Sequence, residues 1–436
     1  MSAFFLPMCM AGLALTGILA GYRIGMVLAG SAALFILISD LPVAFFNLLV
    51  SRIYANVLTN WLLVAIPMFI FMGLMLEISG TAARTLRAAQ QALGGSAAGM
   101  GVSVLVIGVL LAASSGIVGA SVVLLALLAL PRLQETGFDN ATSAGLIASS
   151  GTLAILIPPS VMLIVLGDQL QTSIPDMFAG AIGPGLLLVA LYAVYVVWKS
   201  QGLRPIAQDD KVSLLQVIFD LGPLLVLVFS VLGSILAGIA TPTEASGLGA
   251  FGAILITVLY RKFSIKTLFE AARQTVVTTS LVLFIFVGAT CFSAVFKGIG
   301  GAKMVETGVL AFGTEPYTVL TVVMVSIFLL GFVLDWLEIS LILLPIFAPI
   351  VAGLDFGPEL TGSDLLIWFG ILVAVNLQTS FLTPPFGPTL FYLRGAVGDK
   401  LETRDIYRGI LPFIIMQVIV LISLILFPAI ITTLIS

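Results

Sequence analysis

The segments Ile157-Pro158-Pro159 and Thr383-Pro384-Pro385 place paired prolines inside long apolar stretches of this 436-residue chain. Each pair follows a run of small residues with hydroxyl or amide side chains. Proline has no N–H and clashes with the preceding helical turn, so the carbonyls before each pair lose their helical partners. In hydrocarbon such a break is tolerated only where it is buried in protein or lines a cavity. The two segments therefore predict two broken helices beside a binding site.

The composition predicts that the chain lies in a membrane. It is 60% hydrophobic and 9% charged, with a mean hydropathy of +1.23, whereas soluble proteins average about 45–50% apolar and 25% charged residues. Apolar segments of the ~20 residues that cross a bilayer recur from end to end. The fold class we expect is an all-α polytopic membrane protein, embedded in the lipid bilayer.

Charge and residue usage exclude other classes. The formal charge of −3 and pI near 5.0 give no basic surface for nucleic acid. The absence of histidine removes the usual general base and the commonest metal ligand, which argues against an enzyme and a resident cofactor. No basic region precedes the first apolar segment, so we expect a retained span rather than a signal peptide.

Ten stretches read as membrane-spanning helices. They lie near residues 3–20, 24–41, 61–79, 140–166, 176–198, 214–240, 245–260, 275–297, 364–393 and 409–434. Two further stretches, 96–131 and 316–353, are apolar on both arms but turn midway, at Ser114-Ser115-Gly116 and near Asp335-Trp336. Because their centres lack the residues of an aqueous loop, we interpret both as re-entrant helical hairpins. Broken helices are expected over 140–171 and 364–397.

An internal repeat supports this interpretation. The motif Phe69-Ile70-Phe71-Met72-Gly73 is echoed by Phe284-Ile285-Phe286-Val287-Gly288. Three further pairs follow in the same order, with a separation that rises steadily: Pro131 with Pro349, Pro158-Pro159 with Pro384-Pro385, and Pro184 with Pro412. The span at Phe69 is expected to run inward and its counterpart outward. The halves are therefore predicted to be inverted repeats, with the site near the membrane midplane.

The positive-inside rule sets the orientation. With the N-terminus in the periplasm, all lysines and arginines fall on the cytoplasmic side except Arg52, Lys297 and Lys303. If both hairpins crossed the membrane completely, the same lysines and arginines would lie on the cytoplasmic side. Their distribution therefore supports the orientation but does not test whether the hairpins are re-entrant.

Polar residues beside the breaks and hairpin turns are the site candidates. Hydroxyls and freed carbonyls supply the oxygen ligands that a hard monovalent cation such as sodium prefers. Small polar residues are also common wherever membrane helices pack closely. Asp335 is the strongest candidate, because an ionisable residue in an apolar stretch is costly. Arg394 can face a substrate anion or anchor the cytoplasmic side. Candidate substrate ligands are Ser150, Pro159, Asn376, Gln378, Pro385 and Arg394.

Four ordered motifs carry a family resemblance. The runs SSGTLAILIPPS (149–160), TPTEAS (241–246), GFVLD (331–335) and QTSFLTPPFG (378–387) together resemble the large membrane subunit of tripartite ATP-independent periplasmic (TRAP) transporters. The resemblance implies a bacterial or archaeal inner-membrane importer of organic acids, driven by sodium rather than ATP. Implied partners are a periplasmic substrate-binding protein and a small four-helix membrane subunit, expected here as a separate chain because the first span starts at the N-terminus.

The resemblance also implies an elevator mechanism and site residues. Residues 94–198 and 311–436 would form the moving transport domain, and 1–93 and 214–310 the scaffold, with 199–213 as a cytoplasmic loop. By position, the implied sodium ligands are Ser114, Ser115, Gly151, Thr152, Pro158, Asp335, Thr379, Ser380 and Thr383.

Two other classes stay open. A stand-alone sodium-coupled carboxylate symporter, of the divalent-anion type, would share the repeats and need no binding protein. An intramembrane enzyme would need convergent carboxylates or a metal site, and the sequence offers one intramembrane Asp and no His.

Overall fold

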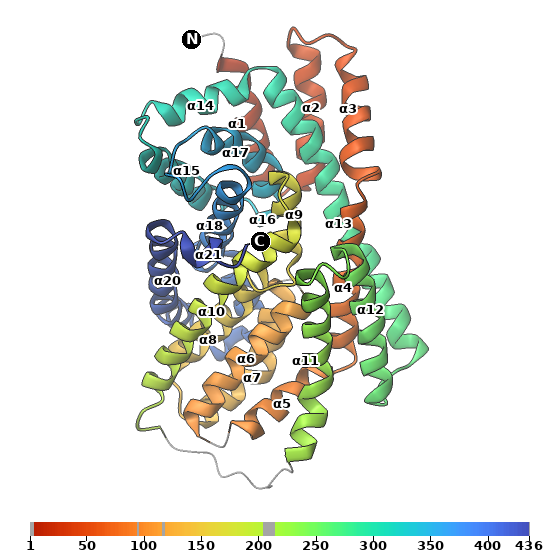
Figure 1. Cartoon of the computed structure of the whole chain (residues 1–436), viewed down its shortest axis with the longest axis vertical. Helices are drawn as coiled ribbons and strands as arrows, with labels where there is room; N and C mark the ends of the chain where they lie inside the picture. The colour runs from red at the N-terminus through yellow and green to blue at the C-terminus, as the bar shows by residue number, and fades with distance from the viewer. Residues whose placement is uncertain (1–3, 94–95, 116–117, 204–213, 436) are drawn as a thin grey trace.

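The computed structural model describes residues 4–93, 96–115, 118–203 and 214–435, and within these ranges the chain is helical with no β-strand. Eight helical segments in the described ranges are apolar and long enough to cross a membrane (Figure 1). This confirms the predicted class, an all-α polytopic membrane protein.

The first half of the chain contains ten helices in its described residues. They are α1 (Phe5–Leu19), α2 (Ile24–Ile38), α3 (Phe45–Ile53), α4 (Ala65–Ile78), α5 (Thr81–Ala92), α6 (Ala97–Ser115), α7 (Val118–Glu135), α8 (Asn140–Thr152), α9 (Val161–Leu170) and α10 (Ile174–Lys199).

The second half contains eleven helices in its described residues. Its helices are α11 (Leu214–Leu236), α12 (Pro242–Leu259), α13 (Ile265–Gly298), α14 (Gly301–Leu310), α15 (Pro316–Leu330), α16 (Trp336–Glu338), α17 (Leu344–Ala352), α18 (Gly362–Leu382), α19 (Pro388–Val397), α20 (Thr403–Leu426) and α21 (Ala429–Thr432). A π-helical turn, Ile339–Leu343, joins α16 to α17, so residues 336–352 form one continuous helical run.

Helical hairpins and broken helices occur where the sequence predicts them. Helices α6 and α7 form the first hairpin, and α15 with α16–α17 forms the second. Figure 1 shows the first hairpin in the lower half of the molecule and the second in the upper half. The proline pairs separate α8 from α9 and α18 from α19, and both Pro–Pro bonds are cis. That each hairpin returns to the membrane side from which it started stays a prediction.

Several elements differ from the expected spans. Short helices α3, α5 and α14 lie where no helix is predicted, because all three are shorter than a membrane span and α5 and α14 are also more polar than one. Helix α13 starts at Ile265, ten residues before the predicted span at 275, because Ser264 accepts a hydrogen bond from the N–H of Thr267 and caps a polar first turn. The last predicted span, 409–434, is divided into α20 and α21 by a break at Phe427-Pro428.

Packing between helices repeats in the two halves. Helix α4 packs on α12, and the equivalent pair is α13 on α2. The repeated motif explains one of these contacts: a Cβ on Gly288 would lie 2.5 Å from the carbonyl oxygen of Gly25, so α13 and α2 touch backbone to backbone. Glycine permits this approach because it has no side chain. The internal repeat is therefore present in the packing as well as in the sequence.

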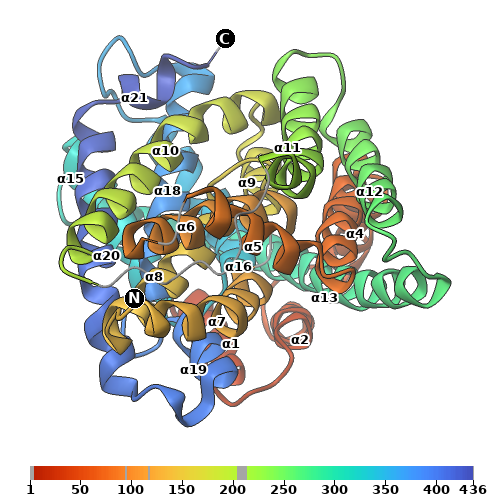
Figure 2. The same ribbon diagram turned by 90° about the horizontal axis from the view of Figure 1, so that it is seen from below.

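Helices α8 and α18, which precede the two breaks, form the centre of the molecule. All residues of 142–156 and of 367–382 are buried. Seen from below, α4, α11 and α12 are grouped on one side, while α6, α8, α10 and α20 lie on the other (Figure 2).

The TPTEAS motif (241–246) lies at the start of helix α12. Thr241 caps α12 and forms a capping box with Glu244: the Glu244 N–H donates to Thr241 Oγ1 at 3.3 Å, and Glu244 Oε2 accepts from the Thr241 N–H at 2.9 Å. Such a box satisfies amides that the first helical turn leaves free. The motif therefore fixes the start of a helix.

Candidate functional site

A cavity of about 180 Å³ lies between α4 and α13 on one side and elements of both halves on the other. Most of its lining is apolar, with a small number of polar groups, as is typical of small-molecule sites. The lining residues are Ile70, Val118, Gly119, Val161, Thr278, Leu281, Val282, Ile285, Asp335, Trp336, Leu337, Phe381, Pro388 and Tyr392.

Four helices begin at this cavity. Val118, Val161, Trp336 and Pro388 are the first residues of α7, α9, α16 and α19, and each of them lines it. Two of these helices come from each half of the repeat. The first turn of a helix carries N–H groups without helical partners and a partial positive charge. The cavity is therefore surrounded by groups that attract an anion.

Asp335 is the acidic residue at this cavity. It precedes α16 as the N-cap, and its Oδ1 accepts a hydrogen bond from the Trp336 N–H at 2.8 Å. The side chain is exposed rather than enclosed. An aspartate in this position leaves carboxylate lone pairs free for a cation beside the anion-attracting helix ends.

Equivalent residues of the internal repeat line the cavity. Ile70 and Ile285 occupy the same position in the two copies of the Phe-Ile-Phe motif, and both line the cavity from α4 and α13. Across from them, a Cβ on Gly119 of α7 would lie 3.1–3.2 Å from the ring of Tyr392 on α19. The first hairpin therefore contacts the second broken helix at this point.

Thr152 and Gln378 connect the two broken helices. Gln378 Nε2 donates to Thr152 Oγ1 at 3.4 Å, while the Thr152 hydroxyl donates to the Ser149 carbonyl at 2.9 Å. The two residues are 226 positions apart, the same separation as Pro158 from Pro384. Each residue is thus the repeat equivalent of the other. A contact between two equivalent positions is what a twofold relation between the halves would produce.

Ser150 and Asn376, which are also repeat equivalents, face the first arms of their hairpins. Ser150 packs on α6, where a Cβ on Gly108 would lie 2.6 Å from its Cβ. Asn376 Nδ2 donates to the Met324 carbonyl on α15 at 2.8 Å. Two buried oxygens in this layer, Ser150 Oγ and Gln378 Oε1, have no hydrogen-bond partner within the described chain. Unpartnered buried oxygens of this kind fit a bound cation.

The hydroxyls before the second break are bonded to backbone. Thr379 donates to Val375 at 2.9 Å, Ser380 to Phe328 at 3.0 Å and Thr383 to Thr379 at 2.7 Å. Because each hydroxyl uses its proton in these bonds, its oxygen lone pairs remain available.

Other candidates lie away from the cavity or outside the described side chains. Ser114 and Ser115 are the last residues of α6, and their side chains, like Gly116, lie outside the described residues. A Cβ on Gly151 would lie 2.3 Å from Val122 Cγ2, so this glycine allows close packing of α8 on α7. Arg394 Nη1 donates to the Leu401 carbonyl beyond the end of α19. Pro158 and Pro159 are buried, and Pro385 is exposed.

Of the predicted site residues, Asp335 is the one found among the described lining residues of the cavity. Sequence reasoning missed the apolar lining from α4 and α13, where Thr278 is the polar member. It also missed Tyr392 and the starts of α9 and α19 as binding elements. A signal for one of them is Pro388, since proline favours the first turn of a helix.

The fold and the cavity define a multi-pass membrane permease with two repeated halves. A sequence model of the DctM component of tripartite ATP-independent periplasmic transporters matches residues 8–430. Because this match covers nearly the whole chain, the protein belongs to that family of transporter components.

Individual relatives show the same relationship. The ectoine TRAP transporter large permease protein TeaC of Halomonas elongata is 31% identical over 375 residues, which cover 84% of each chain. The C4-dicarboxylate TRAP transporter large permease protein DctM of Pseudomonas aeruginosa is 29% identical over 382 residues, 85% of each chain. The isethionate TRAP transporter permease protein DctMQ of Oleidesulfovibrio alaskensis is 29% identical over 411 residues, and the matched region spans 62% of its length.

A solved structure has the same overall fold. The crystal structure of the YdaH transporter of Alcanivorax borkumensis aligns with a TM-score of 0.65 and 12% identity, covering 96% of this chain and 98% of that one. At this identity the similarity concerns the fold alone.

Proposed function

We propose that this protein is the large permease subunit of a sodium-coupled, binding-protein-dependent importer of organic acids in a bacterial or archaeal inner membrane. The observation that carries the proposal is the convergence of four helix starts, two from each half, on one cavity that also holds Asp335. Broken helices that direct their positive ends at an anion and their free oxygens at a coupling cation are typical of secondary transporters.

The substrate class follows from the cavity and from the relatives. The partial positive charges at the starts of α7, α9, α16 and α19 favour a small organic anion. The relatives are named for isethionate, C4-dicarboxylates and ectoine, all small polar organic molecules that carry an acid group. A carboxylate is therefore the proposed substrate.

Sodium is proposed as a co-transported substrate. The oxygens available to it are the Asp335 carboxylate and the hydroxyls of Thr152, Thr379 and Thr383. Ser150 Oγ and Gln378 Oε1, predicted from the sequence as substrate ligands, are unpartnered and are proposed here as further sodium ligands. Oxygen donors with a single negative charge suit a monovalent ion better than a divalent one. Ser114, Ser115, Gly151, Pro158 and Ser380 complete the proposed set.

Movement is proposed to be of the elevator type. Residues 94–198 and 311–436, which contain both hairpins and both broken helices, would move against a scaffold made of 1–93 and 214–310. The cavity supports this division, because α4 and α13 of the proposed scaffold form one wall and the two moving halves form the other. The proposed partners are a periplasmic binding protein and a small four-helix membrane subunit.

Uptake in proteoliposomes tests the proposal. This chain, the small subunit and the binding protein are reconstituted together, and uptake of a labelled carboxylate is measured with an inward sodium gradient or with choline in its place. We expect uptake that requires sodium and all three proteins. Sodium-independent uptake refutes the coupling, and uptake by this chain alone favours the stand-alone symporter of the divalent-anion type.

A further inference from the structure

A second cavity, of about 440 Å³, lies away from the proposed substrate site, where α4 ends, α5 and α11 begin and α12 ends. Three cationic residues line it: Arg84 and Arg87 on α5, and Lys262 just after α12. Asp220 is the acidic residue among its described lining. The cations outnumber the anions, so the cavity favours an anionic ligand.

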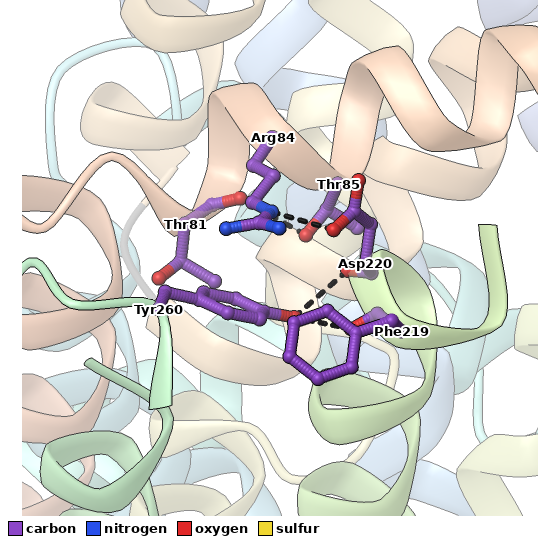
Figure 3. A network of polar contacts seen from close by, with 6 residues as sticks. All are labelled: Thr81, Arg84, Thr85, Phe219, Asp220 and Tyr260. Carbon is purple, nitrogen blue, oxygen red and sulfur yellow. Dashed lines mark hydrogen bonds and ion pairs between the residues drawn. The ribbon is translucent and has the colours of Figure 1, made fainter. Parts of the chain in front are cut away.

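Arg84 is held in a fixed position at this cavity (Figure 3). Its Nε donates to Asp220 Oδ1 at 2.6 Å, and its guanidinium lies 4.3 Å from the centre of the Tyr260 ring. Tyr260 in turn donates from its hydroxyl to the Asp220 carbonyl at 3.0 Å. Burial raises the pKa of the Tyr260 phenol to about 12, so the hydroxyl keeps its proton at neutral pH.

The network leaves donors for a ligand. The Asp220 contact uses Nε of Arg84, while its two Nη groups donate no hydrogen bond within the described chain. Arg87 and Lys262 are exposed at the rim and form no ion pair with a described residue. A guanidinium with a free edge matches the oxygens of a phosphate group.

The start of helix α5 contributes further positive charge to this cavity. Gly80 is its N-cap, with a φ of +75°, and no side chain accepts a hydrogen bond from the first turn. Gly80, Thr81 and Ala83 line the cavity, so the positive end of a 12-residue helix lies beside the cations.

Because membrane spans end near the lipid headgroups, we expect the cavity at headgroup depth. Candidate membrane spans end at Ile78 and Leu259 and begin at Leu215, and the lining residues Ser79, Tyr260 and Gln216 directly follow these positions. Apolar side chains beside the cavity are exposed: Leu215 by 76%, Phe219 by 46% and Leu259 by 49%. An anion bound among the cations would therefore have an apolar surface next to it for hydrocarbon chains.

We propose that this cavity binds a phosphate ester, with the headgroup of an anionic phospholipid as its source. A soluble phosphate compound would use the same cations and the same helix start. The exposed apolar residues favour the lipid, because only a lipid would also cover them.

Thermal unfolding of the purified chain tests the site. Three probes are titrated: dihexanoylphosphatidylglycerol, glycerol 1-phosphate and the zwitterionic dihexanoylphosphatidylcholine. We expect the first to raise the melting temperature at far lower concentration than the other two. The double variant R87Q/K262Q should need more phosphatidylglycerol, by about fivefold for each cation removed. Arg84 is left intact because its ion pair joins α5 to α11.

The variant K266Q serves as the control, since Lys266 is exposed on the first turn of α13 and does not line the cavity. It should respond to phosphatidylglycerol like the wild type. If glycerol 1-phosphate and phosphatidylglycerol raise the melting temperature equally, the cavity binds a phosphate group, but the proposal that this group belongs to a lipid is overturned. A double variant that responds like the wild type would overturn the site itself.

Discussion

The two proline pairs hold equivalent positions in the repeat, yet their surroundings differ. Pro158 and Pro159 are buried, whereas Pro384 is half-buried and Pro385 is exposed. Phe386, directly after the second pair, is 58% exposed. The first break is thus enclosed by protein and the second is open. The repeat therefore makes the two segments equivalent in sequence and leaves them in unequal environments.

The largest effect is expected from removing the charge of Asp335, the acidic residue at the cavity in the second half. Asp335→Asn removes the carboxylate at the cavity and should weaken sodium binding about 100-fold, because loss of a charged ligand costs roughly 3 kcal/mol. The measurement is a sodium titration of thermal stability in a choline background at constant ionic strength. Glu359→Gln, at an exposed position outside the cavity, is the control. Sodium binding by D335N at wild-type affinity would mean that coupling does not depend on this half.

A second prediction compares glycines in the two buried helices. A Cβ on Gly145 of α8 would lie 2.0 Å from the Gly409 carbonyl oxygen, a backbone atom that cannot move away. A Cβ on Gly370 of α18 would meet the flexible ends of Leu170 and Met177, at 2.7 and 2.9 Å. Gly145→Ala should therefore lower the free energy of unfolding by about 3 kcal/mol, and Gly370→Ala by under about 1 kcal/mol.

Denaturant unfolding of the purified variants checks this order. If the two alanine variants lose the same free energy of unfolding, both helices tolerate an added Cβ equally well, which would contradict the expectation from the Cβ distances.

The hydroxyls offer a finer comparison. Thr379 Oγ1 only donates, whereas Thr152 Oγ1 also accepts from Gln378 and has fewer lone pairs left. Thr379→Val should raise the half-saturating sodium concentration about fivefold, and Thr152→Val by less, since one neutral contact contributes about 1 kcal/mol. The same sodium titration measures both. A larger effect at Thr152 would place the tighter site in the first half.

The smallest effect is expected at Arg394. Its guanidinium donates to the Leu401 carbonyl and does not line the cavity, so Arg394→Gln should change the half-saturating substrate concentration by less than about twofold. Uptake by the reconstituted three-protein system gives this value. A tenfold increase would instead make Arg394 a substrate ligand.

Much of the fold could be predicted because hydrophobic length and proline placement act locally. The hairpins, both broken helices and the repeated motif are where the sequence places them. Helices α3, α5 and α14 were not found this way, because they are shorter than a membrane span. Their apolar residues recur with a helical period, which a search for span-length apolar stretches does not use. Side-chain direction near the breaks was not predictable: Ser150 and Asn376 face the hairpin arms, and Ser380 bonds to Phe328. The ligand roles of these residues stay predictions.

The cavity itself depends on tertiary structure. Its anion-attracting groups are backbone amides in the first turns of helices, which every residue type except proline supplies, so side-chain patterns alone do not locate them. Ile70 and Ile285 were found as a repeat and turned out to be a wall of the cavity.

The contact between Thr152 and Gln378 has a consequence for how such a molecule can vary. In an assembly of two identical half-length chains, any residue on the twofold axis would meet its own copy. Two threonines or two glutamines would then face each other there. Because both halves belong to one chain, the two positions differ, and an amide donor meets a hydroxyl acceptor. A single substitution therefore alters one partner of the central contact and leaves the other unchanged.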